Sequence, residues 1–240
     1  MVKKYKKDSS VSYTLGTTLT FELIYNRSDF INKIYIHPNL KKDETYDKLV
    51  NLCHKKSIII EESIKPFNIL SDKENCYVIG EFNKYEDKLE DENHIVLVNP
   101  SDGGNLGTIM RSALGFGINN IAIVRPGVDH FNPKVVRSSM GACFKVHIEY
   151  FDSFDEYYDK YRNHEIYTLM LQATTNLSMI DKPKNKYSLV FGNEGTGLPQ
   201  EFLHIGTPVI IKHSHNIDSL NLPIAVSITL YEFTKERFKE

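Results

Sequence analysis

The 240-residue sequence has few cysteines and no long apolar run, and these absences exclude several classes of protein. Its three cysteines, Cys53, Cys76 and Cys143, are odd in number and widely spaced. With no CxxC pair, they indicate neither a disulfide framework nor a zinc knuckle. The sequence also lacks an apolar stretch of about 18 residues and an apolar signal region after Met1. We therefore expect a soluble, cytoplasmic protein with no membrane partner.

The sequence likewise lacks internal repeats, low-complexity tracts and a strong net charge. The net charge is −2, with 25% charged and 41% hydrophobic residues, which is ordinary globular composition. This balance argues against a nonspecific nucleic-acid coat protein, although a local basic face stays possible. The lysine-rich start, Met1–Ser10, is interpreted as a frayed tail, and the alternative is an arm that seeks phosphates.

The first third of the chain alternates helical and strand-like patterns and predicts a compact α/β/α domain over residues 15–82, after a tail of residues 1–14. A buried element starts near Leu19, and further elements are expected as strands at 34–36, 57–60 and 76–82 and as helices at 46–54 and 64–70. The polar segment 83–94 has no periodic apolar face. It predicts a linker, with a solvated helix as the alternative.

The remainder, residues 95–240, shows strand-like runs separated by helical patterns, which predicts an α/β domain with a largely parallel sheet. The expected strands are 95–98, 121–124, 145–148, 166–171, 187–191 and 208–211. Phe154, Tyr157, Tyr158 and Tyr161 lie at helical spacing and are interpreted as core packing rather than a base-stacking platform. Ligands of such sheets bind beyond the carboxyl ends of the strands, so the loops there are the candidate site.

The first of these loops leads into an amphipathic helix. Apolar residues at 106, 109, 110, 113 and 114 form one stripe, the glycines at 103 and 104 allow a sharp turn, and those at 115 and 117 end the helix. Arg111 lies off the stripe and should lean back over Gly107 toward Asn105 and the free N–H groups of the first turn. Such a corner suits an anion, for instance a nucleic-acid phosphate. A solvated surface arginine is the alternative.

The second loop, Gly192–Pro199, follows a buried strand and has three glycines in six residues, with Glu194 between them. Glycines at this density indicate a close approach of the backbone to another group. Their spacing excludes both the dinucleotide fingerprint and the phosphate-binding P-loop.

The third loop runs from the strand ending at Ile211 to a long helix with Ser219 as its expected N-cap. The buried side of that helix should hold Leu222, Ala225, Val226, Thr229, Leu230 and Phe233. His213 and His215 could chelate a metal, but the sequence places no third ligand, so no metal site is predicted.

Three segments together resemble the motifs of the SpoU (TrmH-like) family of SPOUT methyltransferases. They are Asn105–Ala113, the loop Gly192–Leu198, and Ile211 with Ser219-Leu220-Asn221 and the closing Leu230-Tyr231-Glu232. Pro133–Gly141 is similar to a further family segment, and the 15–82 unit is similar to the L30e-like RNA-binding domain of many relatives. The chain departs from the family pattern at Lys212, His213 and His215.

The resemblance implies a C-terminal SPOUT domain with a mostly parallel sheet and a C-terminal trefoil knot, preceded by a small L30e-like α/β/α domain. It also implies a homodimer whose active sites are completed across the interface. The implied function is transfer of a methyl group from S-adenosylmethionine to a ribose 2′-hydroxyl in RNA. The expected substrate is rRNA rather than tRNA. The alternative is a catalytically inactive RNA-binding protein of the same fold.

The resemblance also implies roles for single residues. Arg111 matches the catalytic arginine of the family, and Asn105, Glu194, Ser219 and Asn221 match the positions that support it. The residues expected to bind the cofactor are Gly192, Asn193, Gly195, Ile211, Ser219 and Leu220.

Overall fold

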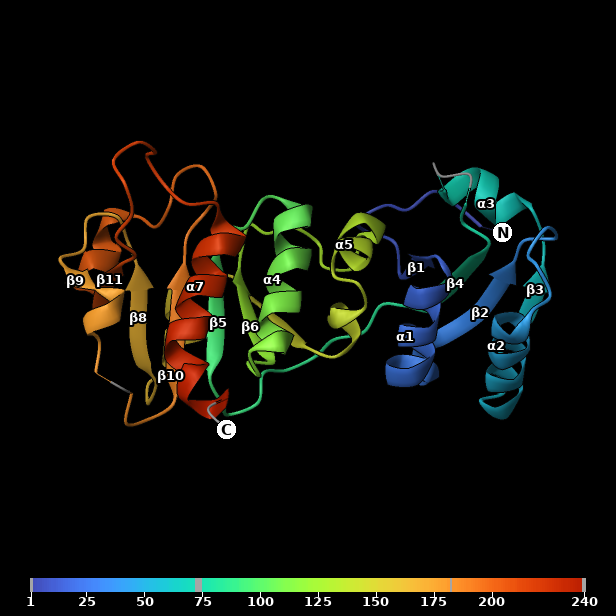
Figure 1. The fold of residues 1–240 in the computed structure, drawn as a ribbon, viewed down its shortest axis with the longest axis horizontal. Helices are drawn as coiled ribbons and strands as arrows, with labels where there is room; N and C mark the ends of the chain where they lie inside the picture. The colour runs from blue at the N-terminus through green and yellow to red at the C-terminus, as the bar shows by residue number, and fades with distance from the viewer. Residues whose placement is uncertain (1, 72–74, 182, 239–240) are drawn as a thin grey trace. The chain divides into compact units, whose positions relative to one another are not determined.

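The computed structural model describes residues 2–71, 75–181 and 183–238, and its contacts divide the chain into two compact units (Figure 1). Unit 1 consists of Met1–Tyr85 and Asp129–Lys145, and unit 2 of Glu86–Val128 and Val146–Glu240. The chain therefore leaves unit 2 after Val128, adds a segment to unit 1, and returns. Within residues 2–71, 75–181 and 183–238, every helix is too short or too polar to span a lipid bilayer.

Unit 1 is built on a four-stranded sheet in the order β1-β4-β2-β3. Strand β4 is antiparallel to both neighbours, whereas β2 and β3 are parallel. The strands are β1 (Val11–Leu15), β2 (Ile31–Ile36), β3 (Ile60–Glu62) and β4 (Val78–Asn83), and the helices are α1 (Thr17–Arg27), α2 (Glu44–Lys55), α3 (Lys65–Leu70) and α5 (Pro133–Ser138).

Several boundaries in unit 1 differ from the sequence-based expectation, and β2, for example, starts at Ile31 rather than at residue 34. The strand expected at 57–60 starts only at Ile60, because Ser57 adopts a left-handed conformation (φ 56°) in the turn that ends α2. Strand β1 lies within the stretch expected to be a tail, and it pairs with β4 from Val11 to Leu15.

Both faces of the unit 1 sheet are covered. One hydrophobic cluster includes Ile24 of α1, Leu49 of α2 and Ile34 of β2. A second includes Tyr13, Tyr35, Phe67 and Ile79, and Val2 and Tyr5 pack against it. The interpretation of the first ten residues as a frayed tail was therefore wrong, because their apolar side chains pack on the core.

Unit 2 contains a seven-stranded sheet in the order β7-β6-β5-β10-β8-β11-β9. Every adjacent pair is parallel, which confirms the α/β class with a parallel sheet. The strands are β5 (His94–Val98), β6 (Asn120–Val124), β7 (His147–Phe151), β8 (Glu165–Leu169), β9 (Thr175–Asn176), β10 (Tyr187–Phe191) and β11 (Thr207–Ile210). The sequence did not predict β9, which is two residues long, and it placed β7 too early because a 3-10 turn at Ala142–Phe144 precedes it.

Helices cover both faces of this sheet. Helices α4 (Gly103–Gly115) and α7 (Leu222–Thr234) lie side by side over one face (Figure 1). Helix α6 (Phe154–Lys160) packs on the other face, in a cluster with Val96 and Val190. Its residues Phe154 and Tyr157, together with Tyr161 just beyond it, are buried there as expected, whereas Tyr158 is 40% exposed.

The ends of α4 and α7 correct two expectations. Helix α4 begins at Gly103, so Gly103 and Gly104 form its first turn rather than a separate bend, and Asp102 caps it. Gly117, with φ 70°, closes its far end as predicted. Helix α7 begins at Leu222 with Asn221 as the N-cap residue, so the prediction of Ser219 as N-cap was wrong.

The segment between the two sheets, 84–93, contains no helix, so the solvated-helix alternative does not hold. It is more than a polar linker, because Tyr85 and Leu89 are each 8% exposed. Tyr85 packs against Phe131 in unit 1, and Leu89 belongs to the main core cluster of unit 2.

A buried polar chain lies at the amino ends of the central strands of unit 2. His94 Nδ1 lies 2.8 Å from the Tyr157 hydroxyl, which lies 2.6 Å from Ser188 Oγ. Ser188 Oγ in turn lies 2.9 Å from Nδ1 of His164. Burial lowers the pKa of His94 to about 4 and also lowers the pKa of His164. Both histidines are therefore neutral in the folded state at pH 7.

This burial predicts acid sensitivity. In the unfolded chain His94 has a pKa near 6.5, whereas in the folded chain its pKa is about 4. Between pH 6.5 and 4 the unfolded state therefore binds the extra proton, and the protein becomes less stable as the pH decreases. His94 alone should lower the free energy of unfolding by about 2 kcal/mol between pH 8 and pH 5. Urea unfolding followed by circular dichroism measures it, and a His94→Gln variant should show a flatter pH dependence. Equal stability of the wild type at pH 8 and pH 5 would contradict this account.

Candidate active site

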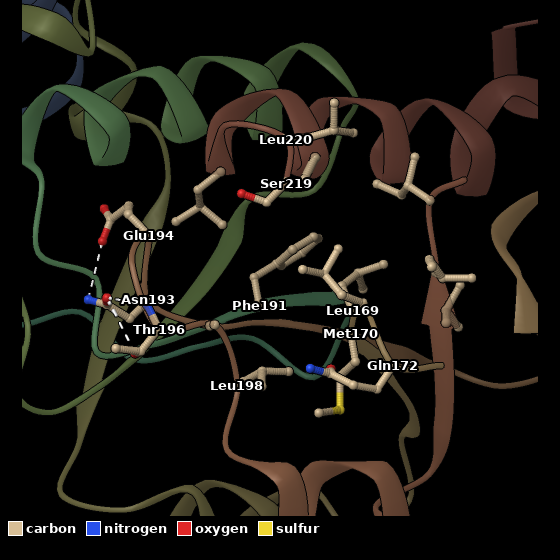
Figure 2. Close-up of a pocket in the computed structure, with 18 of the residues that line it drawn as sticks. Leu169, Met170, Gln172, Phe191, Asn193, Glu194, Thr196, Leu198, Ser219 and Leu220 are labelled. Atoms are coloured by element: carbon tan, nitrogen blue, oxygen red, sulfur yellow. Dashed lines mark hydrogen bonds between the residues drawn. The ribbon is translucent and has the colours of Figure 1, made fainter. Parts of the chain in front are cut away.

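A pocket of about 200 Å³ opens at the carboxyl ends of β8, β10 and β11 (Figure 2). These strands are neighbours in a parallel sheet, so the loops that follow them meet at one edge. The pocket volume is several times the roughly 30 Å³ that one water occupies, so it can admit a small organic molecule. Its lining comprises Leu169–Gln172, Phe191–Leu198, Val209–Ile211, His213, Ser219, Leu220, Leu222 and Ala225.

The loop after β10 folds tightly on itself. Asn193 and Gly197 exchange two backbone hydrogen bonds, of 3.2 and 2.9 Å. A Cβ atom on Gly192 would lie 2.1 Å from the carbonyl carbon of Gly197, so only glycine fits at this position. Gly197 adopts φ 69°, which also favours glycine. The glycines predicted a close approach of the backbone to another group. At Gly192 that group is the backbone of the same loop.

Glu194 joins this loop to the start of α4. Its Oε2 accepts hydrogen bonds from the N–H (3.0 Å) and Oγ (2.8 Å) of Ser101, and its Oε1 accepts one from the N–H of Asp102 (3.0 Å). Asn105 Nδ2 donates to the same Oε1 at 3.3 Å. Burial raises the pKa of this carboxyl, but the hydrogen bonds from Ser101 and Asp102 outweigh it, so the net effect is a lowered pKa. Asn193 Nδ2 adds a longer bond of 3.4 Å to Oε2, so Glu194 is a carboxylate held by five donors.

Asn193 strengthens the same connection. Its Nδ2 donates to the carbonyl oxygen of Asn99 at 2.8 Å, and its Oδ1 accepts from the N–H groups of Gly195 (2.9 Å) and Thr196 (3.2 Å). Figure 2 shows the Asn193 side chain linked to both Glu194 and Thr196. Asn193 therefore fixes the loop that forms one wall of the pocket.

The anion corner predicted at the start of α4 needs correction. The N–H of Asn105 bonds to Oδ1 of the cap residue Asp102 at 2.7 Å, so it is not free. The N–H groups of Ser101 and Asp102 bond to Glu194. The donor-rich corner exists, but two carboxylates of the chain itself occupy it.

The third loop supplies the opposite wall of the pocket. Ile211, Ser219 and Leu220 line it, and Figure 2 shows Ser219 and Leu220 across the pocket from Leu198. His213 also lines it, and its Nδ1 donates to the Ile211 carbonyl oxygen at 2.9 Å, since a carbonyl can only accept. From the sequence, His213 was named as a possible metal ligand and as a departure from the family pattern, and not as a residue of the pocket wall.

Residues Leu169–Gln172 also line the pocket, and sequence reasoning missed them. A usable signal was present, because they end a strand in a parallel sheet. What the sequence did not show is that β8 lies directly between β10 and β11.

Three predicted site residues, Arg111, Asn105 and Asn221, do not line the pocket of the single chain, although Asn105 bonds to Glu194, which does. Arg111 lies on the exposed face of α4 with Gly104 and Thr108, and it forms no hydrogen bond or ion pair with any described residue. Asn221 is exposed at the start of α7. The structure thus gathers Asn105, Glu194 and the expected cofactor-binding residues, and leaves Arg111 facing solvent.

The close contact at Gly192 yields a matched pair of variants. Gly192→Ala forces its Cβ into the Gly197 backbone and should destabilise the protein by about 3 kcal/mol or more. Gly195→Ala adds a Cβ 3.5 Å from Asn193 Oδ1, an ordinary contact, and should change stability little. Urea unfolding measures both. Equal midpoints for the two variants would contradict the tight loop closure.

Residues 92–231 match the model of the SpoU rRNA Methylase family. The chain is 33% identical over 147 residues to an uncharacterized tRNA/rRNA methyltransferase of Synechocystis, and this match spans 60% of the chain but only 53% of that relative. It is 31% identical over 150 residues to a putative tRNA (cytidine(34)-2′-O)-methyltransferase of Listeria innocua, covering 60% of the chain and 88% of the relative.

Among solved structures, the SpoU methyltransferase AviRb of Streptomyces viridochromogenes, in complex with AdoMet, superposes with a TM-score of 0.81 at 19% identity. That likeness covers 95% of this chain and 91% of AviRb and reflects a shared fold. The family model covers more than half of the chain, including the α4 motif and both pocket loops. The chain belongs to the SpoU rRNA methylase family.

Proposed function

We propose that this protein transfers a methyl group from S-adenosylmethionine to a ribose 2′-hydroxyl in RNA. The observation that carries the proposal is the pocket itself. The loops 192–198 and 211–220, which hold two of the three family motifs, line one cavity, and Glu194 ties that cavity to the helix of the first motif. The relatives from Synechocystis and Listeria are named as RNA methyltransferases, which supports the same reaction.

The pocket residues fit an amphipathic nucleoside. Leu169, Phe191 and Leu222 provide apolar surface for a purine, while Ser219 and the glycine-rich loop provide polar groups. A Cβ placed on Gly197 would meet no atom within 4 Å, so the space beside this backbone is open. Gly192, Asn193, Gly195, Ile211, Ser219 and Leu220 would hold the cofactor. S-adenosylmethionine, when bound, supplies an electrophilic methyl group.

Arg111 is the catalytic residue of this proposal. A guanidinium keeps its proton in proteins, so Arg111 acts as a clamp on the substrate phosphate and stabilises negative charge on the ribose oxygen. Asn105 and Glu194 hold the neighbouring loop in place, and Ser219 and Asn221 support the reacting groups. Positioning of this kind supplies about 7–11 kcal/mol of many reaction barriers.

Arg111 faces solvent in the single chain, so the proposed site needs a second copy. Ile224, Ile228 and Tyr231 are 51%, 39% and 57% exposed and form an apolar stripe at i, i+4 and i+7 on α7. Helix α4 is joined to this helix by a 2.8 Å hydrogen bond between the hydroxyls of Ser112, next to Arg111, and Ser227. We propose that this surface forms a homodimer that brings Arg111 to the pocket of the partner.

We propose that the substrate is rRNA rather than tRNA. This choice rests on the similarity of residues 15–82 to an L30e-like RNA-binding domain, which we propose as the substrate-binding part ahead of the methyltransferase domain. The trefoil knot around the third motif stays a prediction, as does cytoplasmic location.

The second candidate function is RNA binding without catalysis, and the exposed Arg111 of the single chain is the observation that favours it.

Methyl transfer tests the proposal directly. The wild-type protein should transfer tritium from labelled S-adenosylmethionine to unmodified rRNA more than to tRNA. Arg111→Lys keeps the charge but loses the planar two-pronged donor, and it should lower turnover by at least about 100-fold with cofactor affinity unchanged. No label in either RNA pool would favour the noncatalytic alternative, and near-wild-type turnover of the lysine variant would contradict the clamp.

The dimer is tested separately. Ile228→Glu places a charge in the centre of the proposed apolar interface and should convert the dimer to monomer in sedimentation velocity runs. Met179→Glu, at a residue that is 77% exposed in the same unit, is the control and should stay dimeric. A wild-type protein that sediments as a monomer at micromolar concentration would argue against the interface.

A further inference from the structure

The lysine-rich segment Val2–Lys7 is held on unit 1 by its two apolar side chains, while its lysines are exposed. Val2 and Tyr5 are half-buried and pack against the cluster formed by Tyr13, Phe67 and their neighbours. The intervening residues Lys3, Lys4 and Lys6 are exposed. The segment therefore presents one face to the core and a different, basic face to solvent.

A buried ionic anchor holds the same segment. The Tyr5 hydroxyl donates a hydrogen bond to Asp129 Oδ2, and Lys84 Nζ lies 2.9 Å from the same oxygen. Lys84 also donates to the carbonyl oxygen of Lys7 at 2.8 Å and stands 4.8 Å from the centre of the Tyr5 ring. The side chains of Lys84 and Asp129 are only 18% and 13% exposed. Two charges are thus buried at the point where the segment Val2–Lys7 is attached.

No carboxylate of the described residues pairs with the three outward lysines. Lys3, Lys4 and Lys6 form no ion pair with any residue that the structure describes, whereas Lys33, Lys84, Lys145 and Lys160 are each paired with a carboxylate. The chain as a whole carries a net charge of −2. Within that background, three unpaired cations in four residues make a local basic strip.

We propose that Val2–Lys7 is a preorganised basic arm that binds the phosphate backbone of RNA. The inference rests on the proposed function for the choice of RNA as the polyanion, and the geometry of the anchor supplies the rest. A loose lysine tail loses backbone freedom when it binds, whereas an anchored one has already lost it on folding. An anionic membrane surface fits less well, because the apolar residues of the arm face the core and leave nothing to insert into lipid.

The charge contribution can be measured through salt dependence. Each phosphate contact releases counterions and adds about 0.7 to 0.9 to the slope of log affinity against log salt. A Lys3→Gln, Lys4→Gln, Lys6→Gln triple variant should therefore reduce the steepness of that slope by about 2 and lower the affinity for RNA at least tenfold near 0.1 M salt. Filter binding to total tRNA and to unmodified rRNA, without cofactor, gives both quantities.

A matched control separates the arm from overall charge. Lys41, Lys55 and Lys56 are also exposed lysines of unit 1, and their triple change to Gln alters the net charge equally. The proposal expects the control to keep most of the affinity and slope of the wild type. An equal loss in both triple variants, or no loss in the arm variant, would overturn it.

The anchor contribution has its own signature. Tyr5→Ala keeps every charge but releases the arm, so affinity should fall several-fold with an unchanged salt slope. Tyr5→Phe keeps the packing and removes the hydroxyl that bonds to Asp129, so it should lower affinity less than Tyr5→Ala. Wild-type affinity in both variants, or a reduced salt slope in the alanine variant, would overturn preorganisation.

These measurements are independent of methyl transfer. If the wild type binds RNA but transfers no label, the proposed reaction fails and the arm can still be judged. If the arm variant loses binding to phosphatidylserine vesicles and keeps its RNA affinity, the arm serves a membrane surface and the proposal is overturned.

Discussion

The proposed site depends on the hydrogen bonds between the Glu194 carboxylate and the start of α4. The carboxylate accepts hydrogen bonds from Ser101, Asp102 and Asn105, and it comes from a loop some ninety residues further along the chain. A helix start offers unpaired N–H groups, and an ionised side chain satisfies them better than water can at a half-buried position. Because of this bond, the glycine-rich loop after β10 and the first turn of α4 are held as one piece. The pocket wall inherits its position from that connection.

The sequence predicted the features that depend on local pattern. Alternation of strand-like runs and amphipathic segments predicted an α/β protein with a parallel sheet, and the seven parallel strands confirm it. The density of glycines between 192 and 197 predicted a close approach of the backbone to another group, and at Gly192 the close neighbour is the Gly197 backbone of the same loop. The loops 192–198 and 211–220 were expected in one site, and both line the pocket.

The features that the sequence did not reveal depend on tertiary partners. Asp102 and Glu194 fill the donor-rich corner at α4, and nothing in the local pattern shows that a carboxylate from a distant loop reaches it. The segment Asp129–Lys145 packs with unit 1 through contacts such as Ser12 Oγ with the Phe131 carbonyl and Arg27 Nε with the Phe144 carbonyl at 3.2 Å. No shift in composition marks this excursion. The sequence likewise does not show that the hydroxyl of Tyr5 bonds to Asp129, which lies 124 residues further along the chain.

The position of β10 has a consequence for how the molecule is made. This strand lies at the centre of its sheet, between β5 and β8, yet the ribosome synthesises it roughly ninety residues after β5. Until it emerges, β5 and β8 each lack a neighbour, and their unpaired backbone edges stay open. Pairings between such distant strands form slowly because long loops must close first. Nascent chains of this protein therefore pass through a stage in which two apolar strands await a central partner, and protection by chaperones would matter most there.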